Sequence, residues 1–316
     1  MNTFTPENPT TVLITGASGL IGGRLIESLL TPRHVCVRAA SRIERIWPDG
    51  VEGYVVDQER AETLHAACEG VDAVINLAAM SERRCALEPQ LALRINAGGT
   101  LAWSMAATAM GVRRFVQVST YKVYGNNPAG VVSEESRTEP RSHYAITHHA
   151  SEDYARLHAS ATVLRLANGF GAPVTSGVDC WDIIVNQFCR QALTEGRITI
   201  RSSGLALRNF IPMSDVVMAL AHAAFQLPAG IYNLGAAQSM SLVDAAERVA
   251  AVCFEIFGFA PAIQAGAPAA NEVHPKLDFR TDKLARAGFQ PNGAMDDELA
   301  RTLRTALAAF GRMADV

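Results

Sequence analysis

The chain has 316 residues, of which 49% are hydrophobic and 19% are charged, a balance typical of folded globular proteins that argues against disorder. Its 28 lysines and arginines are balanced by 31 aspartates and glutamates, so the net charge of −3 gives no reason to expect nucleic-acid binding. The polar N-terminal sequence and the lack of an uncharged apolar run of about 20 residues predict a cytoplasmic protein without a membrane span. The six cysteines form no Cys-x-x-Cys pair, and we expect reduced thiols.

Short apolar runs alternate with helical patterns over the first half of the chain. The runs that predict β-strands are Thr11–Thr15, Val35–Val37, Tyr54–Val56, Ala73–Leu77 and Phe115–Val118. The stretches with helical spacing between them are Leu20–Leu30, Glu62–Cys68 and Pro89–Met110. Because strands that alternate with helices form parallel sheets covered on both faces, we predict an α/β fold with a doubly wound (Rossmann) sheet.

The second half of the chain has a less regular pattern. Strands are predicted at Thr162–Leu166 and Ile231–Leu234. Helices are predicted at Asp179–Leu193, Ser214–Phe225, Leu242–Phe257 and Asp296–Phe310. The stretch Gly258–Ala270 is rich in Ala, Gly and Pro, and we expect a loop there. No shift in composition marks a linker, so we expect the two halves to interlock.

A glycine-rich segment, TGASGLIG at residues 15–22, lies between the first predicted strand and the first predicted helix. Glycine is needed where the backbone turns tightly and where a pyrophosphate must approach the main-chain amides. The following helix directs its free N–H groups and positive dipole end towards such an anion. The segment therefore predicts a dinucleotide-binding turn, and the alternative is a tight βα turn without a ligand. The expected contacts to the dinucleotide are Gly16, Ser18, Gly19, Leu20, Ile21 and Gly22.

This segment matches the TGxxGxxG motif of the extended short-chain dehydrogenase/reductase superfamily. The chain resembles the NAD-dependent epimerase/dehydratase group of that superfamily over nearly its whole length. The resemblance implies a dinucleotide-binding domain at residues 1–166, to which roughly residues 205–235 also contribute. Residues 167–316 would then form mainly a smaller C-terminal α/β substrate-binding region.

The choice of dinucleotide depends on the run that ends at Arg42. An acidic residue that ends the second strand binds the ribose hydroxyls of NAD, and this run has none. Arg38, Ser41 and Arg42 are suited to hold a 2′-phosphate, so the sequence favours NADP, with NAD as the alternative. Ordinary surface charge is the other interpretation of the two arginines. The resemblance further implies dinucleotide contacts from Asp57, Leu77, Ala78 and Ala79.

Two segments resemble the family's catalytic motifs. Residues 118–125 (VSTYKVYG) are similar to its SSxxVYG segment, which implies that the Thr120 hydroxyl binds the substrate oxygen. Tyr144 opens a segment similar to the YxxxK motif, in which the tyrosine is the general acid or base while hydride moves to or from the nicotinamide. The motif's lysine is absent, and His148 takes its place.

On a helix, residues 144 and 148 share a face, so we expect His148 to point towards Tyr144. In the family the lysine lowers the pKa of the tyrosine and binds the nicotinamide ribose. A histidine, with an ordinary pKa of about 6.5, is largely neutral near pH ~7.5. Three interpretations stay open: His148 substitutes with lower activity or an acidic optimum, another cation such as Lys122 assists, or the protein binds its ligands without efficient turnover.

Three residues are expected on the substrate side. Residues 164–171 (LRLANGFG) resemble the family's RxxNx(Y/F)G segment, which implies that Asn168 binds the diphosphate or sugar of a nucleotide sugar. Arg208, in a segment similar to R(D/N)F(I/V)xxxDV, would reach a substrate phosphate, and Ser119 would add a further contact. The arginine that usually precedes the family's C-terminal motif is missing, so a simpler carbonyl or hydroxy compound is the alternative substrate class.

The reaction type follows from the residues after Thr120. Dehydratases of the family have an acidic pair there, whereas this chain has Tyr121 and Lys122, which disfavours a 4,6-dehydratase. We therefore expect an epimerase or a ketoreductase, and the alternative is a catalytically weakened NADP(H)-binding or regulatory protein. The histidines near Tyr144 do not complete a metal-ligand set, so no metal is expected. Similar proteins pair through the helices at Pro89–Met110 and His143–His158, which predicts a homodimer.

Overall fold

The computed structural model describes residues 10–31, 35–268 and 270–311. Most of the polar N-terminal sequence, residues 1–9, lies outside this part. The strands of the central sheet are β1 (Thr10–Thr15), β2 (Val35–Ser41), β3 (Val51–Val55), β4 (Ala73–Asn76), β5 (Arg114–Thr120), β7 (Ala161–Leu166) and β12 (Gly230–Leu234). They form a seven-stranded sheet in the order β12-β7-β5-β4-β1-β2-β3, and all neighbouring strands are parallel.

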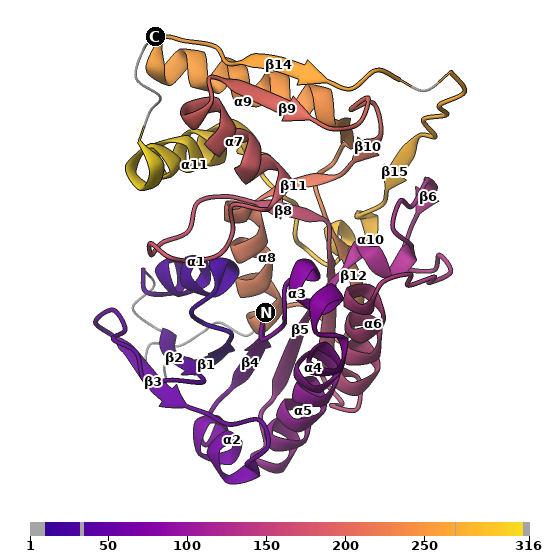
Figure 1. Ribbon diagram of the computed structural model, residues 1–316. Helices are drawn as coiled ribbons and strands as arrows, with labels where there is room; N and C mark the ends of the chain where they lie inside the picture. Colours follow the sequence, from indigo (N-terminus) through magenta and orange to yellow (C-terminus); the bar gives the residue numbers. More distant parts are fainter. Residues whose placement is uncertain (1–9, 32–34, 269, 312–316) are drawn as a thin grey trace.

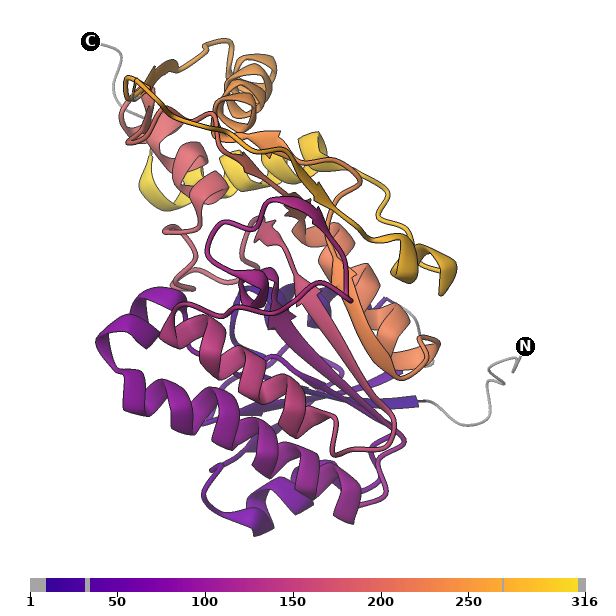
Figure 2. The same cartoon turned by 90° about the vertical axis from the view of Figure 1, so that its right-hand side faces the viewer.

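Helices cover both faces of this sheet (Figures 1 and 2). One face carries α2 (Ala61–Cys68), α5 (Gly99–Ala109) and α6 (His143–Ala155), and the other carries α1 (Leu20–Leu29) and α8 (Met213–Phe225). Successive side chains of a strand point to opposite faces of the sheet. Ile14 therefore belongs to the apolar core with α1 and α8, whereas Leu13 belongs to the core with α2 and α5. The predicted doubly wound α/β fold is confirmed. The strand order reverses between β1 and β4, and ligands bind outside the carboxyl ends of strands at such a point.

A second, smaller part lies above the carboxyl ends of the strands (Figure 1). It contains α7 (Ile184–Thr194), α9 (Leu242–Phe257) and α11 (Met295–Phe310), which share an apolar core with the parallel strands β9 (Arg197–Ile200) and β14 (Ala262–Ala265). The predicted smaller C-terminal α/β part is confirmed, while its boundaries stay a prediction. The remaining short elements are α3 (Glu82–Leu87), η2 (Tyr121–Tyr124), β6 (Gly130–Val132), β8 (Asn168–Phe170), β10 (Leu207–Arg208), β11 (Phe210–Pro212), β13 (Met240–Ser241), β15 (Leu277–Phe279) and α10 (Asp282–Arg286).

A buried ion pair joins the two parts. Arg24 of α1 donates to both carboxylate oxygens of Glu298 of α11, at 2.5 and 2.9 Å. The two side chains are 6% and 2% exposed. The same carboxylate accepts hydrogen bonds from the backbone N–H groups of Ala172 and Ser214. The helix that follows the glycine-rich turn is therefore held by the last helix of the fold.

Three elements differ from the sequence predictions. The predicted helix Pro89–Met110 is divided into α4 (Pro89–Ala92), a π-helical turn η1 (Leu93–Gly98) and α5. In η1 the Asn96 side chain accepts from the Met80 N–H at 2.8 Å and donates to the Thr147 hydroxyl at 2.9 Å, and these contacts accompany the irregular turn. The helix predicted from Asp179 begins at Ile184, and the loop predicted at Gly258–Ala270 contains β14, which is paired with β9.

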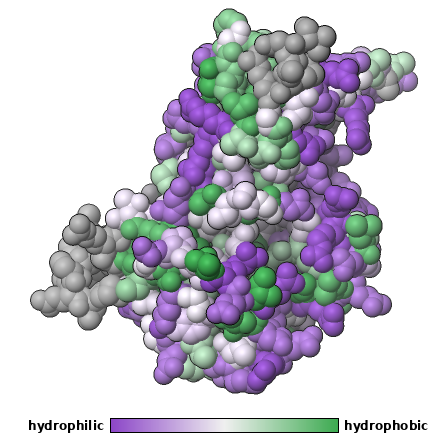
Figure 3. Space-filling model, turned by 60° about the vertical axis from the view of Figure 1, so that its left-hand side comes forward, coloured by the Kyte–Doolittle hydropathy of each residue, from purple (hydrophilic) through white to green (hydrophobic). Residues whose placement is uncertain are grey.

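The described helices include none that is long and apolar enough to cross a membrane. On the face drawn in Figure 3, hydrophilic residues are spread over the surface and hydrophobic residues lie in small groups between them. In the part of the chain that the structure describes, no disulfide joins the cysteines, and five of the six are buried. No group of His, Cys, Asp or Glu side chains in that part could hold a metal ion.

Candidate active site

A cavity of about 1050 Å³ lies at the carboxyl ends of β1, β4, β5 and β7, below the smaller part. Its wall contains segments from both parts of the molecule, so the fold brings together residues that are far apart in the sequence. The predicted site residues in this wall are Gly16, Gly19, Leu20, Ile21, Gly22, Leu77, Ala79, Ser119, Thr120, Tyr144, His148, Asn168 and Arg208. Six others lie outside it: Ser18, Arg38, Ser41, Arg42, Asp57 and Ala78.

The glycine-rich turn connects β1 to α1 at the edge of the cavity. Gly16 has a φ of +61°, and a Cβ there would lie 2.8 Å from the carbonyl carbon of Leu77, so only glycine fits. A Cβ on Gly22 would lie 2.6 Å from the Cα of Ala17. Among the described residues no side chain caps the start of α1 at Gly19, so its first N–H groups are available to an anion.

Thr120 and Tyr144 both line the cavity, and their side chains are hydrogen-bonded to each other. Thr120 ends β5, and its hydroxyl oxygen accepts from the Lys122 N–H at 3.2 Å, which leaves the hydroxyl proton to be donated. Tyr144 lies in the first turn of α6, where the Ser142 hydroxyl caps the helix by accepting from the Ala145 N–H at 3.2 Å. Burial raises the pKa of Tyr144, while a hydrogen bond with the Thr120 side chain opposes this shift and the charge of Glu82 adds to it.

His148 lies one turn after Tyr144 on the same face of α6, as predicted. The two ring centroids are 4.4 Å apart and the rings meet at 63°, edge to face. The side chain is 4% exposed, and neither ring nitrogen has a hydrogen-bond partner among the described residues. Burial lowers the pKa of His148 to about 4, so the imidazole is uncharged near neutral pH.

Ion pairs hold most of the charged groups in the cavity wall. Lys122, considered as a replacement for the missing lysine, binds Glu82 of α3. Arg83 of α3 binds Asp182, in the segment before α7, at 3.2 Å, and Arg84 binds Glu88 at 3.0 Å. The residues of α3 were not predicted as part of the site, because no motif marks them. The one signal was the high density of charge directly after the predicted Leu77–Ala79 turn.

The predicted substrate contacts differ in how free their polar atoms are. Arg208 donates to the Asn127 side chain at 2.7 Å and to the Leu207 carbonyl, and it has no carboxylate partner in the described ranges. Asn168 accepts from the Tyr121 hydroxyl at 3.3 Å and donates to the Asn209 carbonyl at 2.9 Å. Each of these side chains keeps a polar surface on the cavity.

Arg38 does not face the cavity. Its guanidinium donates to Glu52 at 2.8 Å and to the Glu69 carbonyl at 2.5 Å, and it packs over the ring of Tyr54. These partners occupy most of its donors, and the interpretation in which Arg38 holds a 2′-phosphate stays a prediction. Ser41 donates to the Ile43 carbonyl at 2.6 Å. Arg42 and Asp57 are exposed, and Asp57 accepts from the Glu59 N–H.

Comparison with known proteins identifies the family. The model of the NAD dependent epimerase/dehydratase family matches residues 12–235. The chain belongs to this family. A UDP-glucose 4-epimerase of Mycolicibacterium smegmatis is 27% identical over 319 residues, which cover 92% of this chain and 96% of that protein. A dTDP-glucose 4,6-dehydratase of Streptomyces griseus is 29% identical over 251 residues, with coverages of 73% and 75%.

A solved structure of the same fold is the UDP-glucose 4-epimerase of Thermus thermophilus in complex with NAD. It has a TM-score of 0.78 and 25% identity, and the match covers 95% of this chain and 100% of that chain. The resemblance seen in the sequence motifs is thereby confirmed. The relatives of this epimerase/dehydratase family member include both reaction types, so the comparisons leave the choice between them to the residues of the site.

A buried network below the cavity was also missed. In this family member Arg165 of β7 binds Glu152 of α6 at 2.7 Å, with the side chains 5% and 2% exposed. The Ser119 hydroxyl donates to Glu152 at 2.5 Å, and Arg165 also donates to the Tyr124 hydroxyl at 2.9 Å. Ser119 lines the cavity, but its hydroxyl is directed to this network, so its predicted substrate contact stays a prediction. A charged residue inside a predicted buried strand, Arg165, was the available signal.

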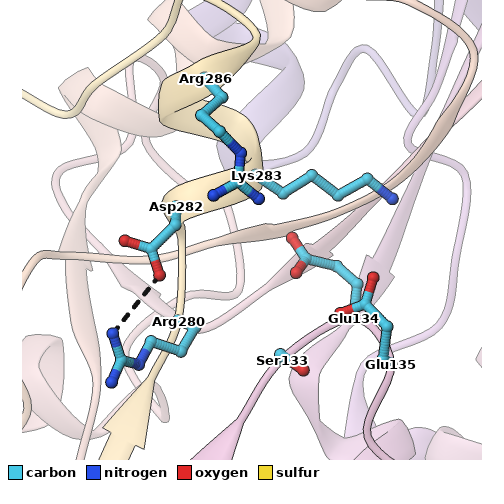
Figure 4. A pocket seen from close by; sticks show the side chains of 7 residues that line it. All are labelled: Ser133, Glu134, Glu135, Arg280, Asp282, Lys283 and Arg286. Carbon is cyan, nitrogen blue, oxygen red and sulfur yellow. Dashed lines mark ion pairs between the residues drawn. The ribbon is translucent and has the colours of Figure 1, made fainter.

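A second pocket, of about 160 Å³, lies between the segment after β6 and the start of α10 (Figure 4). Three of its charged groups, Arg280, Asp282 and Glu134, are engaged with their neighbours. Arg280 binds Asp278 at 2.8 Å and Asp282 at 3.6 Å, and Glu134 accepts from the Asn233 N–H at 2.8 Å. None of the predicted site residues lines this pocket. We therefore assign the chemistry of this epimerase/dehydratase family member to the large cavity.

Proposed function

We propose that the protein uses a nicotinamide dinucleotide to transform a carbonyl or hydroxyl group of a nucleotide sugar or a sugar-like compound. One observation carries the proposal. A single cavity contains the uncapped start of α1, the hydroxyl groups of Thr120 and Tyr144, and the polar side chains of Asn168 and Arg208. These groups are suited in turn to a pyrophosphate, a reacting oxygen and a phosphorylated substrate.

The turn at Gly16–Gly22 and the first N–H groups of α1 would hold the pyrophosphate of the dinucleotide, because no Cβ or side-chain cap blocks them. When bound, the nicotinamide supplies or accepts a hydride. We propose NAD as the dinucleotide, with NADP as the alternative. The engagement of Arg38 with Glu52 and the NAD in the related Thermus thermophilus epimerase support this choice. Arg42, which is exposed, is the remaining candidate for a 2′-phosphate.

The residues near Thr120 favour an epimerase or a ketoreductase over a 4,6-dehydratase. Tyr121 is hydrogen-bonded to Asn168, and the Lys122 ammonium binds Glu82. A hydroxyl on a neighbouring carbon of the sugar would therefore meet no free carboxylic acid from these two positions. The nucleotide part of the substrate is expected at Arg208, because this guanidinium lacks a carboxylate partner in the described part of the chain.

A dinucleotide-binding protein with weakened catalysis is the second candidate function. The buried, uncharged His148 in the position of the family's lysine favours it. Turnover decides between the two candidates, because a protein that only binds would show dinucleotide affinity without product.

The Tyr144→Phe variant tests the proposed function. We expect it to lose nearly all turnover and to keep dinucleotide binding, because only the proton-carrying hydroxyl is removed. Steady-state kinetics with UDP-sugars and calorimetric titration of NAD and NADP would measure the two effects. Tyr154→Phe is a matched control, since Tyr154 is on the same helix and is 37% exposed. Equal turnover in Tyr144→Phe and the native protein would contradict the proposal.

We also propose a homodimer that pairs through α5 and α6. Large apolar side chains are exposed on these helices, Met105 at 62% and Ile146 at 48%, and Leu157, two residues after α6, is 68% exposed. Glutamate at both Met105 and Leu157 is expected to convert a dimer into a monomer, because two charges would be buried in the paired face. Light scattering after gel filtration measures this, and a native chain that elutes as a monomer contradicts the pairing.

A further inference from the structure

The Tyr144–His148 pair has an unusual feature. Buried polar atoms are almost always hydrogen-bonded, yet both ring nitrogens of His148 lack a partner within the described residues. The imidazole is 4% exposed and lines the cavity beside the phenol of Tyr144. A neutral imidazole offers one donor and one acceptor, which is the set of groups that a hydroxyl can satisfy. The two ring nitrogens are therefore placed to bind a hydroxyl group of a ligand in the cavity.

We propose that Tyr144 and His148 form an uncharged pair, in which Tyr144 rests with its proton and gives it to the substrate oxygen, while His148 positions a hydroxyl group of the bound ligand. This inference rests on the proposed function and names its direction, which is the reduction of a carbonyl to an alcohol. His148 is a positioning residue in this scheme, and it does not replace the charge of the absent lysine.

The surroundings of the pair contain little that could stabilise a phenolate. Thr120 is the one neighbouring group described that favours the charged form of Tyr144. Glu82 and Cys85 of α3 and Tyr121 of η2 all raise the pKa of Tyr144, as burial does. The cavity cations Lys122, Arg83 and Arg84 are bound by carboxylates, and the Arg208 guanidinium donates to the Asn127 side chain and to the Leu207 carbonyl. An imidazolium at residue 148 would also be buried, and no carboxylate of the described residues contacts this ring.

The proton balance of the hydride transfer explains why reduction of a carbonyl is the direction we assign. In reduction, the carbonyl carbon gains the hydride that a dihydronicotinamide loses, and the carbonyl oxygen gains the proton of Tyr144. Tyr144 is left as a phenolate and recovers a proton from water. Oxidation of the alcohol needs Tyr144 to be deprotonated first, and the uncharged pair disfavours that state near neutral pH. Tyr144 is therefore in the protonation state that donates a proton to the carbonyl oxygen of the substrate.

Titration of the ligand-free protein tests the charge of the pair without any turnover. The phenolate of Tyr144 is followed by ultraviolet difference absorbance, with Tyr144→Phe subtracted. We expect a pKa above the ordinary value of about 10. His148→Lys should lower it by about 1 to 3 units, because a cation adjoins the phenol. His148→Gln, which is neutral, should leave it unchanged. The inference would be overturned if the pKa of Tyr144 in the native protein were at or below the ordinary value, or if the pKa of Tyr144 were higher in His148→Gln than in the native protein.

Nuclear magnetic resonance of the His148 ring nitrogens, assigned by their loss in His148→Gln, tests the positioning role. We expect a neutral imidazole at all pH values above its pKa of about 4. Addition of NAD alone and of UDP-glucose alone separates the two sources of a hydroxyl, the ribose and the sugar. A shift with either ligand supports the inference, and binding of both ligands without a shift contradicts it. If neither ligand binds, the proposed function and the positioning role both fail, while the titration of Tyr144 still decides the uncharged pair.

The relative rates of the two directions give the last measurement. Near neutral pH, with substrate and dinucleotide both saturating, His148→Lys should raise the ratio of kcat for oxidation to kcat for reduction by about tenfold or more, since one pKa unit is tenfold in phenolate. A ratio that stays unchanged although the Tyr144 pKa falls would overturn the assigned direction, and it would leave the proposed function intact.

Discussion

At the scale of single residues, the burial of His148 has an effect on folding as well as on chemistry. Its pKa is about 4 in the folded protein, against an ordinary value of 6.5. Between these two values the unfolded chain binds a proton that the folded chain does not bind. Stability therefore rises with pH across this window and is lost as the pH falls from 6.5 towards 4.

The His148→Asn variant should remove this contribution. We expect the free energy of unfolding to fall less between pH 6.5 and pH 4 in the variant than in the native protein, by about 3 kcal/mol. Urea unfolding at the two pH values measures the difference. His143→Asn is the control, because His143 is exposed on the same helix. Identical acid sensitivity of His148→Asn and the native protein would contradict the burial of an uncharged imidazole.

The positions of the site residues could be predicted from the sequence, but the partners of their side chains could not. Gly16, Thr120 and Tyr144 belong to short motifs whose spacing follows from one strand end or one helical turn. Arg38 and Lys122 were interpreted as available cations, and both are paired with glutamates. Glu82 is 40 residues before Lys122 in the chain, and only the fold brings them together.

At the scale of elements, the close approach of α1 to the turn before it depends on one glycine. A Cβ on Gly22 would lie 2.6 Å from the Ala17 Cα and from the Gly16 carbonyl oxygen, both of them backbone atoms that cannot move away singly. The next residue, Gly23, is different, since its Cβ would meet only Val174, at 3.7 Å. Alanine substitutions at the two adjacent glycines therefore provide a test variant, at Gly22, and a matched control, at Gly23.

Gly22→Ala should lower the free energy of unfolding by about 1 to 3 kcal/mol, because the helix must shift to admit the methyl group. It should also weaken dinucleotide binding, since the N–H groups of α1 move with the helix. Gly23→Ala should be neutral or stabilising by up to about 1 kcal/mol, because alanine favours a helix. Urea unfolding and calorimetric titration of NAD measure the two effects, and equal behaviour of the two variants would refute the argument.

Most elements of the central sheet were predictable because their apolar runs are long and buried. The elements that the sequence missed depend on contacts with distant parts of the chain. The strand β14 is short and mostly exposed, and it is a strand because it pairs with β9. The π-helical turn η1 contains the side-chain contacts of Asn96 to Met80 and Thr147, which no helical periodicity reveals.

At the scale of the whole molecule, the Arg24–Glu298 pair should carry much of the coupling between the two parts. We expect Glu298→Ala to destabilise the protein by about 3 to 5 kcal/mol, because it removes the buried carboxylate that binds Arg24 and leaves the guanidinium only Glu27 at 3.5 Å and the Ala172 carbonyl. Arg301 and Glu27 join the same two helices at 2.8 Å with side chains 40% and 46% exposed, so Arg301→Ala should cost less than about 1 kcal/mol. Chemical unfolding measures the free energy of unfolding of the two variants. Equal losses of stability in Glu298→Ala and Arg301→Ala would contradict the role of burial.

The same pair also orders the assembly of the protein in time. Glu298 lies in α11, 274 residues after Arg24 in α1, so α1 lacks this partner until α11 has been synthesised. A nascent chain in which α11 has not yet been synthesised contains every strand of the central sheet, and Arg24 then has Glu27 of its own helix as a partner but not Glu298. The helix that follows the glycine-rich turn therefore reaches its final contacts only when the smaller part folds against the sheet.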